Sequence, residues 1–133
     1  MKNTALLLDF LLLNFMLSII IPVYNEEKTV LQLIERLLAL PELSQGAKFI
    51  VVDDGSTDQT NALLKNSPYH QDERFVFIFQ EKNQGKGAAI RAGLSAASGD
   101  YTIIQDADLE YDPADIIRLW RQAEEEGLTV LYG

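Results

Sequence analysis

The 133-residue sequence contains no cysteine and a single histidine, His70. The absence of cysteine excludes a disulfide framework, a zinc–thiolate site and a cysteine nucleophile. We expect His70 at the surface because it lies in the polar segment 67–72, so a reaction that needs a histidine base is disfavoured. Basic residues are also scarce, since 11 Lys and Arg stand against 20 Asp and Glu, a formal net charge of −9. This charge argues against nucleic acid or an anionic membrane as a purely electrostatic partner.

The sequence also lacks an apolar run long enough to span a membrane. The apolar segment 1–17 is interrupted by Asp9 and Asn14, and it has neither a basic start beyond Lys2 nor the small-residue cleavage site of a signal peptide. We interpret 1–17 as an N-terminal extension, which either forms an amphipathic or membrane-facing helix or reflects a start site upstream of the natural one at Met16. The segment 18–133 is expected to form one domain, because 47% hydrophobic and 23% charged residues are typical of a globular core.

Apolar strand patterns alternate with amphipathic helix patterns along the rest of the chain. Strands are predicted at 18–23, 48–52, 75–79, the first half of 100–113 and 128–132, and the third, apolar on both faces, is expected at the centre of the sheet. Helices are predicted from an Asn25 cap to Pro41, from a Ser56 or Thr57 cap through 58–66, from about Gly85 past Gly93, and from Asp112 and Pro113 to Gly127. The alternation predicts an α/β fold, a three-layer, mostly parallel sheet with helices on both faces.

Two carboxylates, Asp106 and Asp108, follow the fourth predicted strand. Residues two apart share one side of a strand, so these carboxylates would lie roughly 6–7 Å apart and repel each other unless a cation neutralises them. Oxygen ligands suit hard cations, Mg²⁺ or Mn²⁺, which complete their coordination with water and substrate phosphates. The alternative is a solvated turn between strand and helix, where Asp is common.

Three other polar clusters also follow predicted strands: Pro22 to Glu26, Asp53-Asp54, and Gln84 to Lys86. The carboxyl ends of parallel strands meet at one edge of a sheet, so these clusters are expected to converge on one crevice. Adjacent Asp residues there can hold a ribose or base, and a glycine-rich helix start favours an anion. Each cluster alone has a structural alternative: complementation of a helix dipole, an Asp-rich turn, or close packing of a small-residue helix. Together they predict a site for a nucleoside diphosphate bound through a metal ion.

The segments 18–26, 51–58, 83–93 and 99–113 resemble family 2 glycosyltransferases of the GT-A fold. The Asp-Ala-Asp-Leu-Glu-Tyr-Asp-Pro segment and the Gly-Lys-Gly-Ala-Ala run are most similar to the dolichyl-phosphate mannose synthase branch, which includes bacterial polyprenyl-phosphate glycosyltransferases. The resemblance extends from Ser18 to Gly133. It implies catalytic and metal-binding roles for Asp106 and Asp108. It implies nucleotide-sugar binding by Pro22, Tyr24, Glu26, Val52, Asp53, Asp54, Lys86, Arg91, Asp106, Ala107, Asp108 and Glu110.

The resemblance also implies a reaction, the inverting, metal-dependent transfer of a hexose from a GDP- or UDP-sugar to a polyprenyl or dolichyl phosphate. It implies a cytoplasmic protein, in one version peripheral at the cytoplasmic face of the membrane. Members of the family continue well beyond this length, so we expect a truncated chain whose exposed sheet edge favours a homodimer. The alternatives are a nucleotide-sugar-binding module without catalysis and a sugar-phosphate nucleotidyltransferase. The second would need a glycine-rich, basic loop after the first strand, where this chain has 24–27, Tyr-Asn-Glu-Glu.

Overall fold

The computed structural model describes residues 17–110, 112–127 and 130–132. Its core is a five-stranded sheet in the order β3-β2-β1-β4-β5, in which every neighbouring pair is parallel. The strands are β1 (Leu17–Val23), β2 (Ala47–Asp53), β3 (Phe75–Phe79), β4 (Tyr101–Ile104) and β5 (Val130–Tyr132). The predicted α/β class with a parallel sheet is therefore confirmed. The expected extension 1–17 lies outside the described residues except for Leu17, which is a fully buried residue of β1.

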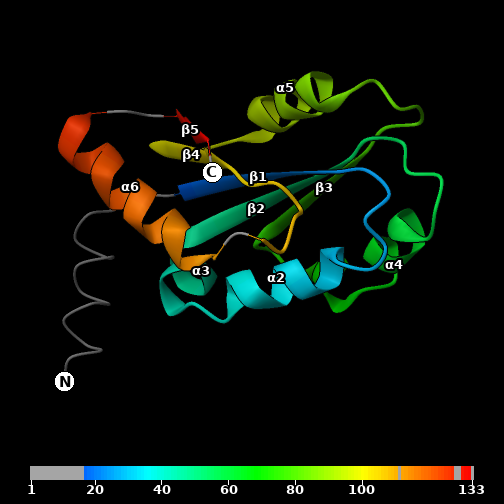
Figure 1. Ribbon diagram of the computed structural model, residues 1–133, viewed down its shortest axis with the longest axis horizontal. Helices are drawn as coiled ribbons and strands as arrows, with labels where there is room; N and C mark the ends of the chain where they lie inside the picture. Colours follow the sequence, from blue (N-terminus) through cyan, green and yellow to red (C-terminus); the bar gives the residue numbers. More distant parts are fainter. Residues whose placement is uncertain (1–16, 111, 128–129, 133) are drawn as a thin grey trace.

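Helices cover both faces of the sheet, as predicted (Figure 1). They are α2 (Val30–Leu38), α3 (Pro41–Gly46), α4 (Thr60–Lys65), the 3₁₀ helix η1 (Pro68–Gln71), α5 (Lys86–Ala96) and α6 (Ala114–Glu126). One face, called here the wide face, packs against α2, α3, α4 and α6, and the opposite, narrow face packs against α5. Within the described residues, none of these helices has the length and apolar content needed to cross a membrane.

The alternation of side chains along β1 divides the core between the two faces. Ile19 and Ile21 point to the wide face, where they join Leu33 and Leu37 of α2, while Ile20 points to the narrow face. The narrow face is filled by small residues of α5. A Cβ atom added to Gly93 would lie 2.5 Å from Cγ2 of Ile20, so the backbone of α5 approaches the sheet as closely as glycine allows.

β3 lies at one edge of the described sheet, where it pairs with β2, so the prediction that it is central is wrong. Its Phe residues have another explanation. Phe75 and Phe77 stack with ring centroids 5.7 Å apart and lie near η1, where the His70 ring is 5.7 Å from Phe77. On the opposite face Val76 is 36% exposed, as expected for an edge strand. His70 is exposed, as predicted. The homodimer through an exposed edge stays a prediction.

Two predicted helix caps are wrong. Asn25 does not cap α2, which begins at Val30, because the amide oxygen of Asn25 accepts hydrogen bonds from the backbone of Thr57 and Asp58 instead. Neither Ser56 nor Thr57 caps α4, whose N-cap is Gln59 and has no side-chain capping bond. The carboxylate of Asp58, just before it, accepts the Thr60 N–H at 2.9 Å. The Asn25 side chain thus bonds to the neighbouring loop, while the Asp58 side chain bonds to the backbone of its own loop.

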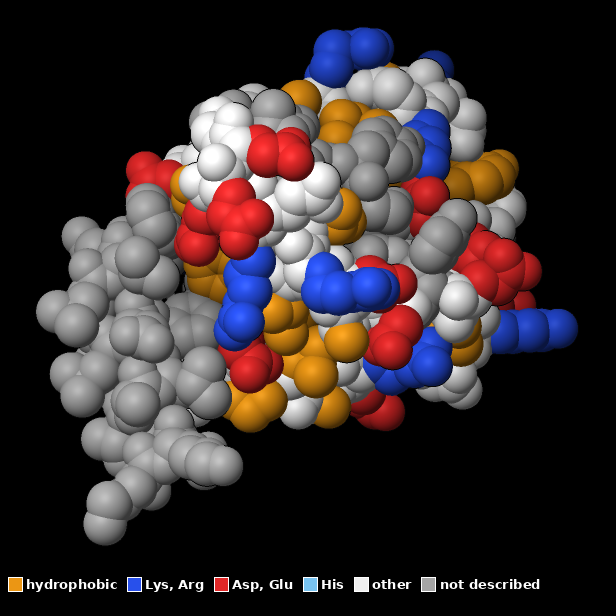
Figure 2. Space-filling view, turned by 60° about the vertical axis from the view of Figure 1, so that its left-hand side comes forward, with side chains coloured by type: hydrophobic (Ala, Val, Ile, Leu, Met, Phe, Trp, Pro, Cys, Tyr) orange, Lys and Arg blue, Asp and Glu red, His pale blue; other side chains and the backbone are white. Residues whose placement is uncertain are grey.

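The surface on the α6 side carries acidic and basic side chains interleaved with small apolar areas (Figure 2). Interleaving reduces like-charge repulsion, because basic side chains lie between acidic ones. On the face shown, the acidic side chains of the described residues are therefore not gathered into one patch.

Candidate functional site

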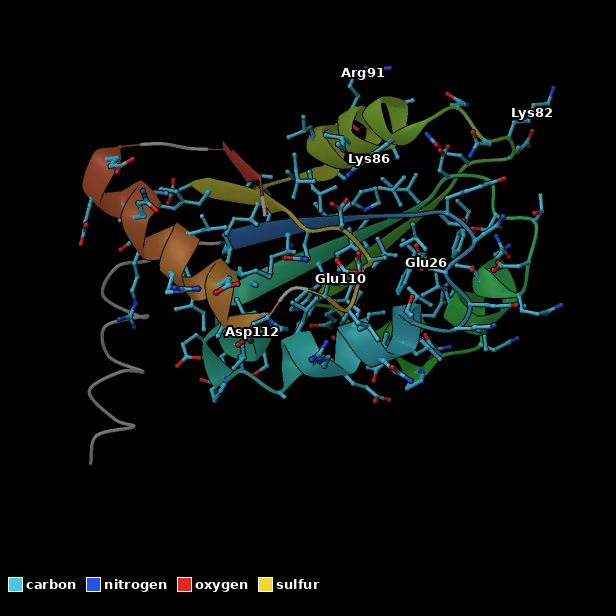
Figure 3. All side chains as sticks on the ribbon, viewed as in Figure 1. Glu26, Lys82, Lys86, Arg91, Glu110 and Asp112 are labelled. Atoms are coloured by element: carbon cyan, nitrogen blue, oxygen red, sulfur yellow. The ribbon has the colours of Figure 1, made fainter. Side chains whose placement is uncertain are left out.

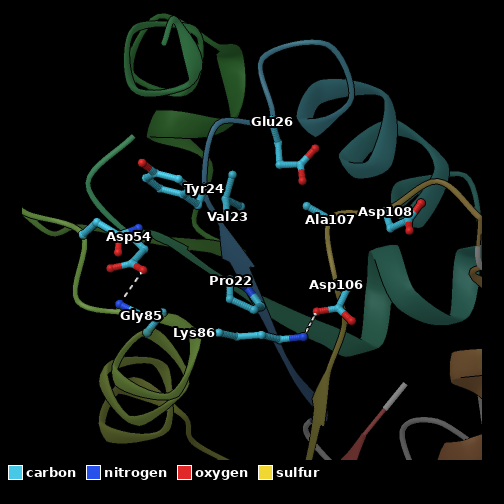
Figure 4. Close-up of a pocket in the computed structure, with 12 residues that line it drawn as sticks. Pro22, Val23, Tyr24, Glu26, Asp54, Gly85, Lys86, Asp106, Ala107 and Asp108 are labelled. Atoms are coloured by element: carbon cyan, nitrogen blue, oxygen red, sulfur yellow. Dashed lines mark hydrogen bonds and ion pairs between the residues drawn. The ribbon is translucent and has the colours of Figure 1, made fainter. Parts of the chain in front are cut away.

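A pocket of about 430 Å³ opens at the carboxyl edge of the sheet (Figure 4). The loops after β1, β2, β3 and β4 all contribute to its wall, as expected for a parallel sheet. The residues that line it are Pro22, Val23, Tyr24, Glu26, Asp54, Asn83, Gly85, Lys86, Ala89, Asp106, Ala107 and Asp108. The structure therefore brings together residues that are more than 80 positions apart in the sequence.

The loop after β1 presents Tyr24 and Glu26 to the pocket. Asn25 between them has a left-handed backbone, φ 51°, which is uncommon for a residue with a side chain. Its amide oxygen accepts the Thr57 N–H at 2.8 Å, and its own N–H donates to Oγ of Ser56 at 2.9 Å. These bonds stabilise the unusual conformation and connect the first loop to the second. Tyr24, 43% exposed, is held at the pocket mouth as a result.

Further bonds strengthen the same connection. The Glu26 N–H donates to the Thr60 hydroxyl at 2.9 Å, and the Glu27 N–H donates to the Asp58 carboxylate at 3.3 Å. Burial raises the pKa of Asp58, but the hydrogen bonds from Thr60 and Glu27 outweigh it, so the pKa lies below its ordinary value. Asp58 is therefore held as an anion between two backbone donors, one from each of the two loops.

Asp54 organises the glycine-rich loop that follows β3. Its two carboxylate oxygens accept the backbone N–H groups of Gln84 at 2.8 Å and Gly85 at 2.9 Å. The loops after β2 and β3 are also in backbone contact, since a Cβ atom on Gly55 would lie 2.5 Å from the backbone nitrogen of Asn83. Asp54 thus fixes the point at which α5 begins, and its carboxylate lies in the pocket wall.

Asp53 and Val52 do not line the pocket. The Val52 side chain is fully buried in the core on the α5 side. Asp53 is 1% exposed; its Oδ1 accepts the Ser56 N–H at 3.1 Å, and its Oδ2 is buried without a hydrogen-bond partner among the described residues. Neighbouring residues therefore separate Val52 and Asp53 from a ligand in the pocket.

Asp106 and Asp108 lie in the loop beyond β4, which ends at Ile104. The Gln105 N–H still bonds to the Ile20 carbonyl at 2.8 Å, but the two carboxylates come after that last ladder bond. The prediction that they share one side of a strand end is therefore wrong, although both line the pocket. Asp106 forms an ion pair with Lys86, and Asp108 is exposed with its Oδ1 accepting the Glu110 N–H at 2.9 Å.

The loop after β4 that carries Asp106 and Asp108, called here the acidic loop, is held in place by α2 and the turn before it. Arg36 donates to the Leu109 carbonyl at 2.9 Å, and the Thr29 hydroxyl donates to Glu26 at 2.8 Å and contacts the Ala107 carbonyl at 3.4 Å. These contacts join the loop after β1 to the acidic loop, because Glu26 and Ala107 both contact the Thr29 hydroxyl.

The donor set suits a divalent cation that brings further ligands of its own. In the described ranges 17–110, 112–127 and 130–132, no three His, Cys, Asp or Glu side chains are placed to hold a metal ion. Asp106 and Asp108 nevertheless offer carboxylate oxygens to the same pocket. Mg²⁺ is commonly bound in this way, through one or two carboxylates with water and phosphate oxygens. The residues therefore fit a metal that binds together with a phosphate ligand.

Two further predicted residues lie outside the pocket lining, Arg91 and Glu110. Arg91 lies five residues after Lys86 on α5, about 140° around the helix, and Figure 3 shows its side chain on the outer side. Glu110 is exposed, and its backbone serves the Asp108 carboxylate. The other predicted site residues all line the pocket: Pro22, Tyr24, Glu26, Asp54, Lys86, Asp106, Ala107 and Asp108.

The sequence interpretation missed four lining residues: Val23, Asn83, Gly85 and Ala89. All four lie in the quoted segments 18–26 and 83–93, so the signal was present. Ala89 is the informative case. It is fully buried one turn into α5, and only the close approach of that helix brings it to the pocket wall.

Comparison with known proteins agrees with this geometry. The family described as "Glycosyl transferase family 2" matches residues 18–133. Undecaprenyl-phosphate 4-deoxy-4-formamido-L-arabinose transferase of Proteus mirabilis (strain HI4320) is 41% identical over 109 residues, 81% of this chain and 33% of the relative. The enzyme of that name from Yersinia pestis (strain Pestoides F) is 42% identical over the same length. The chain thus spans about a third of the length of these curated relatives.

Solved structures with the same arrangement include nucleotide-sugar complexes. S. aureus TarS in complex with UDP-GlcNAc superposes with a TM-score of 0.68 at 26% identity, over 83% of this chain and 31% of that one. The mannosyltransferase PcManGT from Pyrobaculum calidifontis, in complex with GDP-Man and Mn²⁺, has a TM-score of 0.63 at 26% identity, over 69% of this chain and 27% of that one. The GT-A fold implied by the sequence motifs is confirmed. With the family match covering nearly all of the described residues, the chain belongs to glycosyltransferase family 2.

Proposed function

We propose that this chain is the donor-binding part of a glycosyltransferase that transfers a sugar from a nucleoside-diphosphate sugar to a polyprenyl phosphate, with a divalent cation. The observation that supports it most is the meeting of Lys86, Asp106 and Asp108 with Tyr24 and Asp54 in one pocket. An ammonium group, two carboxylates and an aromatic ring are the chemistry that a diphosphate, a metal ion and a base require.

Each end of the pocket suits a different part of the donor. Tyr24 presents an exposed ring on which a base can stack, next to the Asp54 carboxylate (Figure 4). The start of α5 has backbone N–H groups without intrahelical partners, and Lys86 adds a positive charge there, so this end suits the diphosphate. Asp106 and Asp108 lie across from it, where they can hold a cation against the same phosphates.

When bound, a divalent cation would neutralise the charge that develops on the diphosphate as the glycosidic bond breaks. Asp106 and Asp108 are the residues that would hold this cation in place. Two of the solved relatives, PcManGT and the Mycobacterium tuberculosis glucosyl-3-phosphoglycerate synthase, contain Mn²⁺. We infer Mn²⁺ or Mg²⁺ for this chain.

The acceptor proposal is supported by the names of the relatives, which are undecaprenyl-phosphate transferases. A lipid phosphate is already an anion, so its attack on the sugar needs little help from a general base. This agrees with a pocket whose lining contains no histidine. A lipid acceptor would place the reaction at a membrane surface, which we propose is the cytoplasmic face. The relatives are named for a formamido-arabinose, a pentose, so the hexose expected from the motifs stays a prediction.

Calorimetric titration tests the proposal with UDP, GDP, UDP-GlcNAc and GDP-mannose, each with Mn²⁺, Mg²⁺ or EDTA. We expect binding that depends on the metal, and we expect Asp108→Ala to weaken it at least about tenfold, because a metal ligand is lost. Asp100→Ala is the matched control, since Asp100 is an exposed carboxylate at the other end of β4 and should leave binding unchanged.

Two results would contradict the proposal in different ways. If no nucleotide bound with either metal, donor binding by this chain would be wrong. If Asp108→Ala and Asp100→Ala behaved alike, the metal-binding role of Asp108 would be wrong. Binding without any transfer or hydrolysis of the donor would instead support a nucleotide-sugar-binding module.

A further inference from the structure

The ion pair between Lys86 and Asp106 crosses the pocket from the start of α5 to the acidic loop (Figure 4). The two side chains come from separate elements, and both are part of the pocket lining. They are also accessible, with 48% of the Lys86 side chain and 31% of the Asp106 side chain exposed. Ion pairs with this much exposure contribute little stability, so a ligand can replace either partner.

The charges around the pair are unbalanced. Among the described residues that line the pocket, four are carboxylates, Glu26, Asp54, Asp106 and Asp108, and Lys86 is the one ammonium group. Asp54 already accepts two backbone N–H groups, so its charge is partly compensated. Lys86 is thus the counter-ion of the acidic loop, and it occupies a carboxylate that a divalent cation would use.

Lys86 and a metal ion cannot both hold the Asp106 carboxylate closely without repelling each other. A donor diphosphate resolves this conflict, because it offers its own anionic oxygens to the ammonium group. Lys86 is the first residue of α5, and the amino end of a helix favours phosphate, so the side chain has a new partner within reach of its present position.

We propose that Lys86 is an exchangeable counter-ion of Asp106, which opposes metal binding while the pocket is empty and moves to the diphosphate when metal and donor bind together. This inference rests on the proposed function for the identity of the diphosphate. It makes Lys86 a positioning residue that couples two ligands. Coupling between binding sites is reciprocal, so the donor increases metal affinity by the same factor as the metal increases donor affinity.

A simpler role for Lys86, phosphate binding alone, makes a different prediction. In that case the loss of the ammonium group weakens donor binding and leaves the affinity for a metal ion alone unchanged. The proposed exchange requires the affinity for the metal alone to increase when Lys86 is neutralised, because the competing cation is gone.

The experiment measures Mn²⁺ binding to the full 133-residue chain by calorimetry and by the electron paramagnetic resonance signal of free Mn²⁺. We expect Lys86→Gln to bind Mn²⁺ without nucleotide about tenfold more tightly than the wild type, within the usual range for coupled sites. Lys86→Arg keeps the charge and should stay near the wild type. Lys82→Gln is the matched control, because Lys82 is an exposed lysine in the loop before α5 and does not line the pocket (Figure 3).

The coupling is measured by repeating the titrations with saturating UDP or GDP. Nucleotide should increase Mn²⁺ affinity strongly in the wild type and about tenfold less in Lys86→Gln. In the double variant with Asp106→Asn, the gain in affinity for Mn²⁺ alone should disappear, since the carboxylate released by Lys86 is absent. Circular dichroism and thermal unfolding establish that each variant is folded.

The inference is overturned if folded Lys86→Gln binds Mn²⁺ alone no more tightly than the wild type. It is also overturned if Lys82→Gln shows the same gain, because the effect would then come from net charge. Failure of UDP and GDP to bind the wild type would contradict the proposed function, while the titrations with Mn²⁺ alone would still decide whether Lys86 competes for Asp106.

Discussion

The two faces of the sheet pack against their helices through side chains of different size. The wide face packs against four helices through large side chains, among them Phe49, Leu33 and Trp120. The narrow face packs against α5 through Ala89 and Gly93. Large side chains bury more apolar area, so the wide face supplies most of the stability. Small side chains permit close approach, so the narrow face determines where α5, and with it Lys86, lies at the pocket. Stability and site geometry are therefore separable in this fold.

The largest expected effect comes from the wide face. Phe49 is fully buried and stacks on Phe75 with ring centroids 4.8 Å apart. Phe49→Ala should lower the free energy of unfolding by about 3–5 kcal/mol, measured by urea denaturation, because it leaves a cavity. Metal-dependent nucleotide binding, measured where the variant is folded, should change less than about twofold. Phe77→Ala, at a partly buried position of β3, is the control and should lose clearly less stability. Equal losses would contradict this account of the wide face.

Alanine substitutions at two glycines of α5 test two different effects, close packing at Gly93 and helix propensity at Gly87. Gly93→Ala should lower the free energy of unfolding by about 1–3 kcal/mol, because its Cβ would lie 2.5 Å from Ile20. It should also weaken nucleotide binding, since α5 must move away from the sheet. At Gly87 the nearest atom to an added Cβ is the flexible Arg91 guanidinium at 3.4 Å. Gly87→Ala should therefore stabilise the chain by about 0.5–1 kcal/mol.

A second substitution sharpens the test on the narrow face. Ile20→Ala removes the atoms that the new methyl group would meet, so in combination with Gly93→Ala it should recover part of the lost nucleotide affinity. Additive losses in stability and in affinity would show that the position of α5 does not depend on this contact.

The smallest expected effect lies at the amino end of β3, far from the pocket. The Arg74 guanidinium, which donates to the Asp72 carboxylate at 2.6 Å and to the Ser44 carbonyl at 3.1 Å, holds the pKa of Asp72 below its ordinary value of 3.8. The pKa is lower in the folded than in the unfolded chain, so the pair contributes stability above pH 3.8 and loses it as the pH falls through the native value.

Asp72→Asn should accordingly lower the free energy of unfolding by about 1 kcal/mol at pH 7, and the difference from wild type should shrink below about pH 4. Glu73→Gln removes the same charge from the adjacent exposed position and should leave stability nearly unchanged. Urea denaturation at pH 7 and pH 3 measures both. A loss that did not depend on pH would contradict a role for the ionised pair.

The fold class was predictable because strand and helix patterns are local. Every predicted strand is present, and the motifs after four of them meet at one edge. Strand order was not predictable in the same way. The β3 segment is apolar on both faces, which is typical of a central strand. Its Phe rings, however, pack against Tyr69 and His70 of η1, a contact that local sequence does not reveal. Burial by a 3₁₀ helix and burial in a central strand require the same residue types.

Within the site, the pattern predicted which loops meet but not what each side chain does there. Asn25 matches a helix cap in sequence, yet its amide oxygen bonds to a loop about thirty residues away. Asp54 was expected to contact a nucleotide, and both of its oxygens accept backbone N–H groups of the glycine-rich loop. Arg91 follows Lys86 in the same motif, and the helical turn places it on the outer surface. These outcomes depend on tertiary contacts that local patterns do not encode.

Contact between the backbones of the loops after β2 and β3 also bears on how these loops can be exchanged between relatives. Gly55 leaves no room for a side chain next to Asn83, and Asp54 holds the following residues through their N–H groups. A segment grafted from a relative at only one of these positions would meet an unmatched neighbour. The turn at Gly55 and the stretch before Lys86 are therefore compatible as a pair, and an engineer who exchanges one of them must exchange the other with it.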